Sequence, residues 1–128
     1  MIQRFIELGE GYSDLYELLE IARSRPDKVT HFLILKSRSD NRAAVSAAVV
    51  LKPVKPGDFQ PLYICREGIP LKENKSERQQ MVEEAASELG ARLVEMEIKP
   101  SSEFNEKELF YQYVIGILRL HHIIPPLQ

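Results

Sequence analysis

The sequence has 128 residues, with 17 Lys or Arg against 19 Asp or Glu, and a formal net charge of −2 at pH 7. Hydrophobic residues make up 44% and charged residues 28%. These proportions exclude collagen-like, low-complexity and strongly disordered chains, and they predict one globular domain over residues 1–128.

The N-terminal part predicts a short strand followed by a helix. Residues 2–8 form the expected strand, which the sequence Gly9-Glu10-Gly11 ends. Ser13 is a favourable N-cap, so the helix is expected to begin there, with leucines at helical spacing on its buried face. Pro26 prevents the helix from continuing.

Three strands are predicted next, at residues 29–36, 43–51 and 62–66. A polar turn at residues 37–42 and a proline-rich loop join them, so we expect an antiparallel meander. The segment 43–51 is nearly all apolar, which predicts a central strand that is covered on both faces.

The C-terminal part predicts a helix, a strand and a last helix. Ser76 caps the first of these helices, with Gln79 placed for a capping box and Gly90 at its end. Residues 91–99 alternate between apolar and charged side chains, as expected for a strand with one face in the core. Ser102 is the predicted cap of the last helix, from about residue 103 to residue 120.

The predicted order is therefore β-α-β-β-β-α-β-α. It indicates an α/β or α+β fold, in which a single-layer mixed sheet of about five strands, with the meander in its middle, is packed by three helices. The order of the strands across the sheet stays open, because local patterns do not specify it.

The last helix is more apolar than packing against one sheet face requires. Its polar positions form one narrow stripe of Glu108, Gln112, Gly116 and Arg119. Either the helix is buried on two sides within the chain, or its surplus apolar surface meets a second copy in a homodimer. For the homodimer, the predicted self-association residues are Tyr113, Val114, Ile117 and Leu118.

Charge is uneven along the chain, since residues 23–55 hold eight basic and two acidic residues. This segment predicts an alternative function, an anion-binding or nucleic-acid-binding site. The site would use Arg38, Arg42, Lys52 and Lys55. The acidic net charge and the lack of interleaved aromatic residues argue against nucleic acid and favour a solvated basic rim.

No catalytic, cofactor-binding or metal-binding set is predicted. Gly9 and Gly11 lack the third glycine of a dinucleotide fingerprint, and Glu10 would repel a phosphate. Adjacent His121 and His122 would point about 100° apart on a helix, which disfavours a shared metal.

A small enzyme of unknown reaction is a further alternative. It would need Cys65 as a nucleophile, with His31 as the candidate base on a neighbouring strand. A buried and inert Cys65 is the favoured interpretation. A single cysteine also fits a reducing compartment, so we expect a cytoplasmic protein. The apolar stretch at residues 110–124 is too short and too polar to span a membrane.

The opening segment, MIQRFIELGEGYSDLYEL at residues 1–18, resembles the start of a small uncharacterised protein family of Bacillus-type bacteria. The resemblance implies a cytosolic protein. Some members of such families carry the label methylthioribose kinase, which this sequence does not support. It shows no nucleotide cradle, no metal-binding acid pair and no catalytic base of a sugar kinase.

Taken together, the sequence predicts a cytoplasmic, non-catalytic module without a cofactor. We expect it to act through protein contacts or a small regulatory ligand, and to self-associate as a homodimer.

Overall fold

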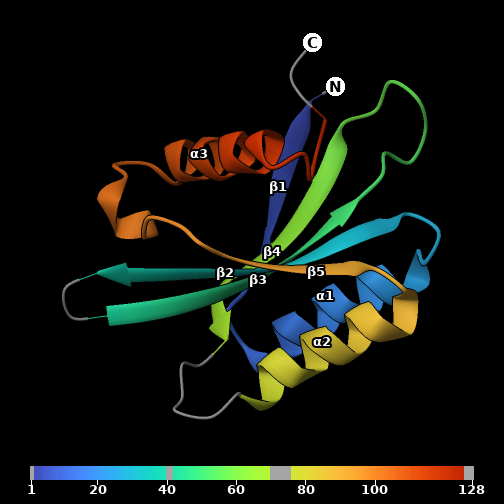
Figure 1. Ribbon diagram of the computed structural model, residues 1–128, viewed down its shortest axis with the longest axis horizontal. Coiled ribbons are helices and arrows are strands. Elements are labelled where there is room, and N and C mark those ends of the chain that lie inside the picture. The colour runs from blue at the N-terminus through green and yellow to red at the C-terminus, as the bar shows by residue number, and fades with distance from the viewer. Residues whose placement is uncertain (1, 40–41, 70–75, 126–128) are drawn as a thin grey trace.

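The computed structural model describes residues 2–39, 42–69 and 76–125, which form a five-stranded sheet covered by three helices (Figure 1). The elements are β1 (Gln3–Leu8), α1 (Tyr12–Ser24), β2 (Val29–Ser39), β3 (Arg42–Leu51), β4 (Gln60–Ile69), α2 (Glu77–Leu89), β5 (Arg92–Glu97) and α3 (Lys107–Leu120). A short 3-10 helix at Ser101–Glu103 precedes α3. The predicted order of strands and helices is confirmed, and the fold is α+β.

The strands follow the order β1-β4-β3-β2-β5 across the sheet. The predicted antiparallel meander of β2, β3 and β4 is confirmed, with β3 in the middle of the sheet. β1 pairs parallel with β4, where Phe5 lies opposite Leu62, and β5 pairs parallel with β2, where Val94 lies opposite Leu33. β1 and β5 are therefore the two edges of the sheet.

Both parallel crossovers run toward the same edge of the sheet. One leads from β1 through α1 to β2, and the other leads from β4 through α2 to β5. Right-handed crossovers that travel in one direction place their helices on one face. Accordingly, α1 and α2 lie together on one face, and α3 covers the other (Figure 1).

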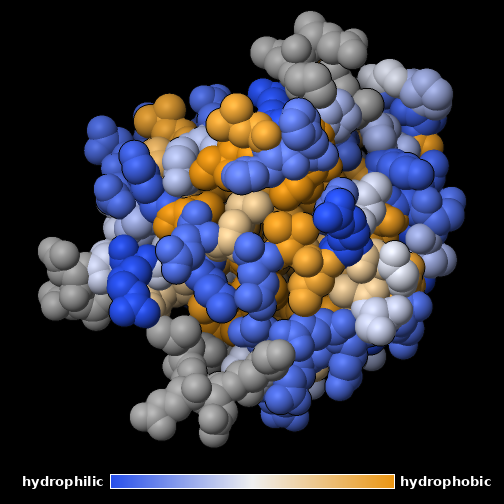
Figure 2. All heavy atoms as spheres, in the orientation of Figure 1, coloured by the Kyte–Doolittle hydropathy of each residue, from blue (hydrophilic) through white to orange (hydrophobic). Residues whose placement is uncertain are grey.

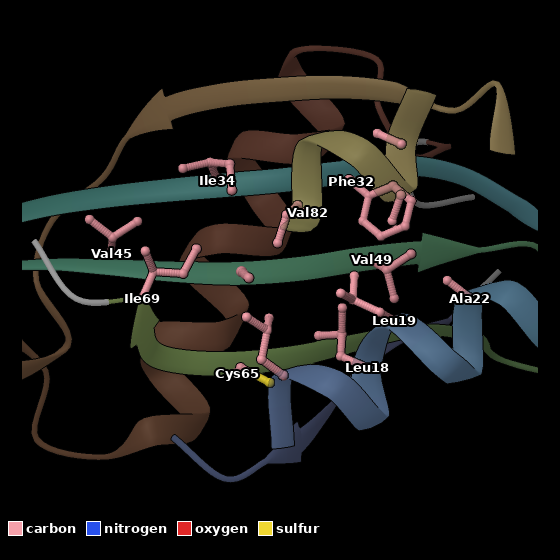
Figure 3. Packing of buried hydrophobic residues seen from close by; sticks show 14 of the residues in the cluster. Leu18, Leu19, Ala22, Phe32, Ile34, Val45, Val49, Cys65, Ile69 and Val82 are labelled. Carbon is pink, nitrogen blue, oxygen red and sulfur yellow. The ribbon is translucent and has the colours of Figure 1, made fainter. Parts of the chain in front are cut away.

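The sheet separates two apolar cores, because successive side chains of each strand point to opposite faces. In the core under α1 and α2, Leu18, Phe32, Val49 and Val82 pack together without exposed surface (Figure 3). The core under α3 contains Leu33, Val50, Leu62, Phe110, Val114 and Leu118. The strong burial on both sides explains why β3 is almost entirely apolar.

The hairpin between β2 and β3 is longer than predicted. Residues 37–42 were expected to form a turn, but Ser37 pairs with Ala44 and Arg38 pairs with Ala43. Polar side chains are compatible with a strand where the hairpin meets solvent. β4 is also longer than the predicted 62–66, since it runs from Gln60 to Ile69 and includes the buried Gly68.

The first helix is capped differently from the prediction. Its N-cap is Gly11 rather than Ser13, and Asp14 accepts a hydrogen bond from the Gly11 N–H at 3.0 Å. The Asp14 carboxylate lies against Gly9, at the position where any side chain of residue 9 would begin. An acidic side chain in the first turn also suits the positive end of the helix dipole.

The second helix follows the prediction at both ends. The Ser76 hydroxyl accepts a hydrogen bond from the Gln79 N–H at 3.1 Å, and Gly90 has the left-handed φ of 67° expected at a C-cap. The Gln79 side chain does not complete a capping box. It donates instead to Glu95 on β5, at 3.1 Å.

The last helix begins later than predicted. Ser102, the expected N-cap, belongs to the 3-10 helix, and α3 starts at Lys107. The interruption lies at Phe104, whose extended backbone lets its ring pack edge-on against Phe110, with 5.7 Å between the ring centroids. Burial of this aromatic ring outweighs continuation of the helix.

Candidate functional site

A groove of about 610 Å³ runs between the edge strand β1 and helix α3. Its β1 side includes Gln3, Arg4 and Phe5, and its α3 side includes Glu108, Gln112 and Arg119. The three helix residues are polar positions of the stripe found in the sequence. The stripe therefore lines a concave surface rather than a flat solvent-facing one.

Polar contacts at both ends hold α3 antiparallel to β1. At one end, the Lys107 ammonium donates to Glu7 Oε2 at 2.8 Å. At the other end, Arg119 Nη2 donates to Gln3 Oε1. Between them, the Phe5 and Tyr111 rings stack with 4.8 Å between centroids. These contacts leave the polar stripe beside the open edge of β1.

Arg119 is the least satisfied polar group of the groove. Its Nε is buried and has no hydrogen-bond partner among the described residues, where Arg119 also has no carboxylate in ion-pair range. Buried donors in native proteins are nearly always satisfied. A guanidinium that lines a groove and has no carboxylate among the described residues is therefore suited to an acidic acceptor from outside the chain.

Gln3 holds Arg119 in place. Gln3 is only 5% exposed, and its side-chain amide nitrogen donates to Gln60 Oε1 at 3.3 Å and to the Pro125 carbonyl oxygen at 3.4 Å. The amide orientation that serves these two acceptors turns Gln3 Oε1 toward Arg119. This arrangement fixes one nitrogen of the guanidinium and leaves its remaining donors for other acceptors.

The groove is electrically asymmetric. Arg119 supplies positive charge near Gln3. The Arg4 side chain instead points to the opposite face of β1, where its guanidinium lies over the Phe59 ring, 5.4 Å from the ring centroid. Glu108, exposed in the first turn of α3, supplies negative charge toward the other end. A ligand with an acidic group at one end matches this distribution.

Glu7 forms the centre of a polar cluster beside the groove. Its Oε1 accepts a hydrogen bond from the Tyr111 hydroxyl at 2.8 Å and lies 3.2 Å from Arg66 Nε. Burial alone would raise the pKa of Glu7, but the hydrogen bonds from Lys107 and Tyr111 and the charges of Arg66 and Lys107 outweigh it and lower this pKa. Burial and the Glu7 hydrogen bond raise the pKa of Tyr111. Near neutral pH the carboxylate is ionised and the phenol protonated, so both act as structural partners.

The backbone of β1 also contributes to the groove. The Ile2 carbonyl accepts a hydrogen bond from the Gln60 N–H at 2.7 Å, so the even-numbered residues of β1 bond to β4. In a parallel pair, the backbone N–H and C=O groups of the intervening residues point away from the partner strand. The N–H and C=O groups of Gln3, Phe5 and Glu7 therefore face the open edge.

The residues predicted for self-association lie on different parts of α3. Val114 and Leu118 are fully buried in the core, so a second copy cannot touch them in this conformation. Tyr113 and Ile117 are half-buried at the border of that core. The Tyr113 hydroxyl accepts a hydrogen bond from the Lys99 N–H at 3.0 Å.

The four residues predicted for anion binding are not brought together. Arg38 and Arg42 lie where the β2–β3 hairpin turns, whereas Lys52 and Lys55 follow the other end of β3. At about 3.4 Å per residue, roughly 30 Å of strand separates the two pairs. One small anion therefore cannot contact all four.

The structure separates the candidate nucleophile from its candidate base. Cys65 is fully buried under α1, as predicted, and burial together with the charges of Asp14 and Glu17 raises the pKa of its thiol to about 12. His31 lies two strands away and lines a hollow on the α3 face. Burial and the charge of Arg92 lower the pKa of His31.

All three histidines meet at that hollow, which has a volume of about 270 Å³ and includes His121 and His122. They do not form a metal site. Within residues 2–39, 42–69 and 76–125, no group of three His, Cys, Asp or Glu side chains has the geometry to hold a metal ion. In the same part of the chain, no helix has the length and apolar character required to cross a bilayer.

The sequence shows the polar residues of one wall of the groove, but it does not predict the groove itself. The stripe of polar residues on α3 was visible in the sequence, but nothing local to Gln3 or Arg4 connects them with a helix more than 100 residues later. The available signal in the sequence is that Gln3, Arg4 and Glu7 place polar side chains on both faces of β1, which an edge strand tolerates.

Comparison with known proteins finds a family and no characterised relative. No curated protein matches the chain, and no solved structure matches it. A family model described as a domain of unknown function matches residues 1–124, nearly the whole chain. This chain therefore belongs to the DUF7147 family.

Proposed function

We propose that this chain is a non-catalytic binding module that holds an acidic ligand in the groove between β1 and α3. The observation that carries the proposal is Arg119, whose buried Nε has no partner among the described residues although Gln3 holds the same guanidinium in place. Guanidinium groups bind carboxylates and phosphates through two parallel hydrogen bonds. Gln112, which also lines the groove, supplies a further donor.

Binding without catalysis fits the state of the reactive groups nearby. Glu7 is engaged by three partners, and Tyr111 is protonated and bonded to it. A general acid or base requires a pKa near the working pH and a free path to the substrate. These two groups offer neither, so we assign them to the support of the groove.

A titration of the ¹⁵N-labelled protein with small anions tests the proposal. Succinate and inorganic phosphate serve as probes. We expect the amide signals of Gln3, Arg4 and Gln112 to shift as the anion concentration rises and to reach a plateau when the site is full. Arg119→Gln should abolish these shifts, whereas the matched variant Arg38→Gln at the hairpin should retain them. Unchanged spectra with both probes, or shifts that persist in Arg119→Gln, would contradict the proposed site.

A second candidate function is self-association through the flank of α3 on the β5 side. Tyr113, Ile117 and Leu120 are spaced by four and three residues and form one stripe. Leu120 is 79% exposed. Figure 2 shows hydrophobic side chains gathered over α3 and along β5. We infer a two-fold homodimer that buries this flank, which could coexist with an occupied groove on the other side of the helix.

Light scattering over a concentration series tests the homodimer. We expect the wild type to be dimeric and Leu120→Glu to be monomeric, because the buried charge would oppose association. Leu120 contributes little to the monomer core, so this variant should fold. Val54→Glu, at a residue that is 63% exposed in the β3–β4 connection, is the matched control. A monomeric wild type rules out this candidate.

We also infer a cytoplasmic location. The single cysteine is unpaired and buried, which fits a reducing compartment, and the resemblance of the opening segment to a family of Bacillus-type bacteria supports the same location. Fractionation of cells that produce the native chain would test this inference.

A further inference from the structure

We propose that the ligand of the groove is a short extended peptide, which adds to the sheet as a strand beside β1 and places a carboxylate at Arg119. This inference rests on the proposed binding function and specifies its partner. It joins three independent features of the groove: an open strand edge, a helix that faces it, and, at one end, a guanidinium with no carboxylate partner among the described residues.

The open edge supplies the main-chain contacts. The N–H and C=O groups of Gln3, Phe5 and Glu7 point away from β4 and have no backbone partner among the described residues. An extended peptide satisfies such groups by continuing the ladder. The three residues span about 13 Å, which corresponds to a bound segment of roughly four to six residues.

The helix supplies side-chain selectivity. Alternate side chains of an added strand point toward α3. There they meet the apolar surface of Phe5 and Ile115 and the ring of Tyr111, all of which line the groove. A strand edge flanked by a helix in this way is a recurring arrangement for peptide recognition, in which pockets along the helix select every second residue.

The charges along the groove determine at which end the acidic group of the peptide binds. Arg119 lines the groove near Gln3, and Glu108 lies toward the opposite end. An acidic side chain or a C-terminal carboxylate would be stabilised at the first end and opposed at the second. The proposed partner is therefore an extended segment with alternating apolar residues and an acidic residue at one end.

The first experiment selects partners for the full chain from a random hexapeptide library displayed with free C-termini. We expect enriched sequences to alternate apolar and polar residues and to carry a terminal acidic group. A selected peptide is then synthesised for binding measurements. Arg119→Gln should weaken its binding by about tenfold to a hundredfold, as expected for loss of a charge-assisted hydrogen bond. Arg38→Gln should leave the affinity unchanged.

Hydrogen exchange of backbone amides distinguishes strand addition from any other binding mode. The bound peptide should slow exchange at Phe5 and Glu7, whose N–H groups face the open edge. Arg4 and Ile6, which already bond to β4, should change little. Every second N–H of the bound peptide should bond to β1. N-methylation of these residues should abolish binding, whereas N-methylation of the residues between them should preserve it.

The outcomes separate this inference from the proposed function. If succinate or phosphate binds at Arg119 but no selected peptide protects Phe5 and Glu7, the groove is a small-anion site and the peptide proposal is wrong. If exchange at Phe5 and Glu7 slows when the protein concentration is raised without any peptide, a second copy of the chain occupies the groove. This result also contradicts the peptide proposal. If neither small anions nor peptides bind at the groove, the proposed function itself fails.

Discussion

The Tyr111 hydroxyl donates a hydrogen bond to Glu7 Oε1 at 2.8 Å, and so joins α3 to the edge strand β1 across 104 residues of sequence. Tyr111 is 9% exposed, and its ring stacks on Phe5. The pair therefore fixes the spacing between the two walls of the groove.

Removal of this hydroxyl should destabilise the fold. We expect Tyr111→Phe to lower the free energy of unfolding by about 1–3 kcal/mol, because a hydrogen bond to a charged acceptor is lost inside a half-buried cluster. Urea denaturation measures the difference. Tyr16→Phe, at a tyrosine that is 50% exposed on α1, is the control and should change stability little. Equal effects of the two substitutions would contradict the assigned role of Tyr111.

The Glu7 cluster should also make stability depend on pH. The pKa of Glu7 in the folded chain is below its ordinary value of 4.5. A lowered folded pKa gives stabilisation that is present above the unfolded pKa and is lost as the pH falls through the folded pKa. Wild type should therefore exceed Glu7→Gln in unfolding free energy at pH 7, and the gap should shrink at pH values below about 4. A gap that is constant with pH would refute this linkage.

Cys65 should be unreactive in the native protein. Its thiol is buried, and its pKa is raised to about 12, so the reactive thiolate is scarce at neutral pH. We expect a thiol reagent such as iodoacetamide to modify the chain only after unfolding in guanidinium, as mass spectrometry would record. Rapid modification of the folded chain would reopen the interpretation of Cys65 as a nucleophile.

The two serines that the sequence predicts as helix caps should respond differently to substitution. Ser76 accepts a hydrogen bond from the Gln79 N–H, so Ser76→Ala should destabilise the protein by about 0.5–2 kcal/mol. Ser13 lies inside the first turn of α1 and is exposed, so Ser13→Ala should have almost no effect. Thermal unfolding of both variants provides the comparison.

These two serines also show what could be predicted from the sequence. Strands and helices follow from local patterns such as the apolar run of β3 and the Gly90 stop, and both predictions are confirmed. The exact start of α1 could not be predicted, because Ser13 and Gly11 are both acceptable caps and the carboxylate of Asp14 decides between them. The start of α3 depends on the packing of Phe104, which is a tertiary contact.

The site was less predictable than the fold. A polar stripe on the last helix indicated one surface, but its meaning depends on which strand lies beside it. β1 reaches that position only through the strand order, which long-range pairing with β4 determines. For the same reason, the basic residues of segment 23–55 looked like one cluster in sequence, whereas the length of β3 separates them.

The contact between Gly9 and Asp14 carries a consequence for the evolution of this family. A methyl group on residue 9 would occupy the space of the Asp14 carboxylate, which itself secures the start of α1 through the Gly11 N–H. Substitution at either position alone is therefore penalised through the same cap, because a side chain at residue 9 would displace the Asp14 carboxylate and a change of Asp14 would remove it. Lineages that exchange Gly9 for a larger residue should carry a compensating shorter side chain at position 14, and the two sites should drift as a pair.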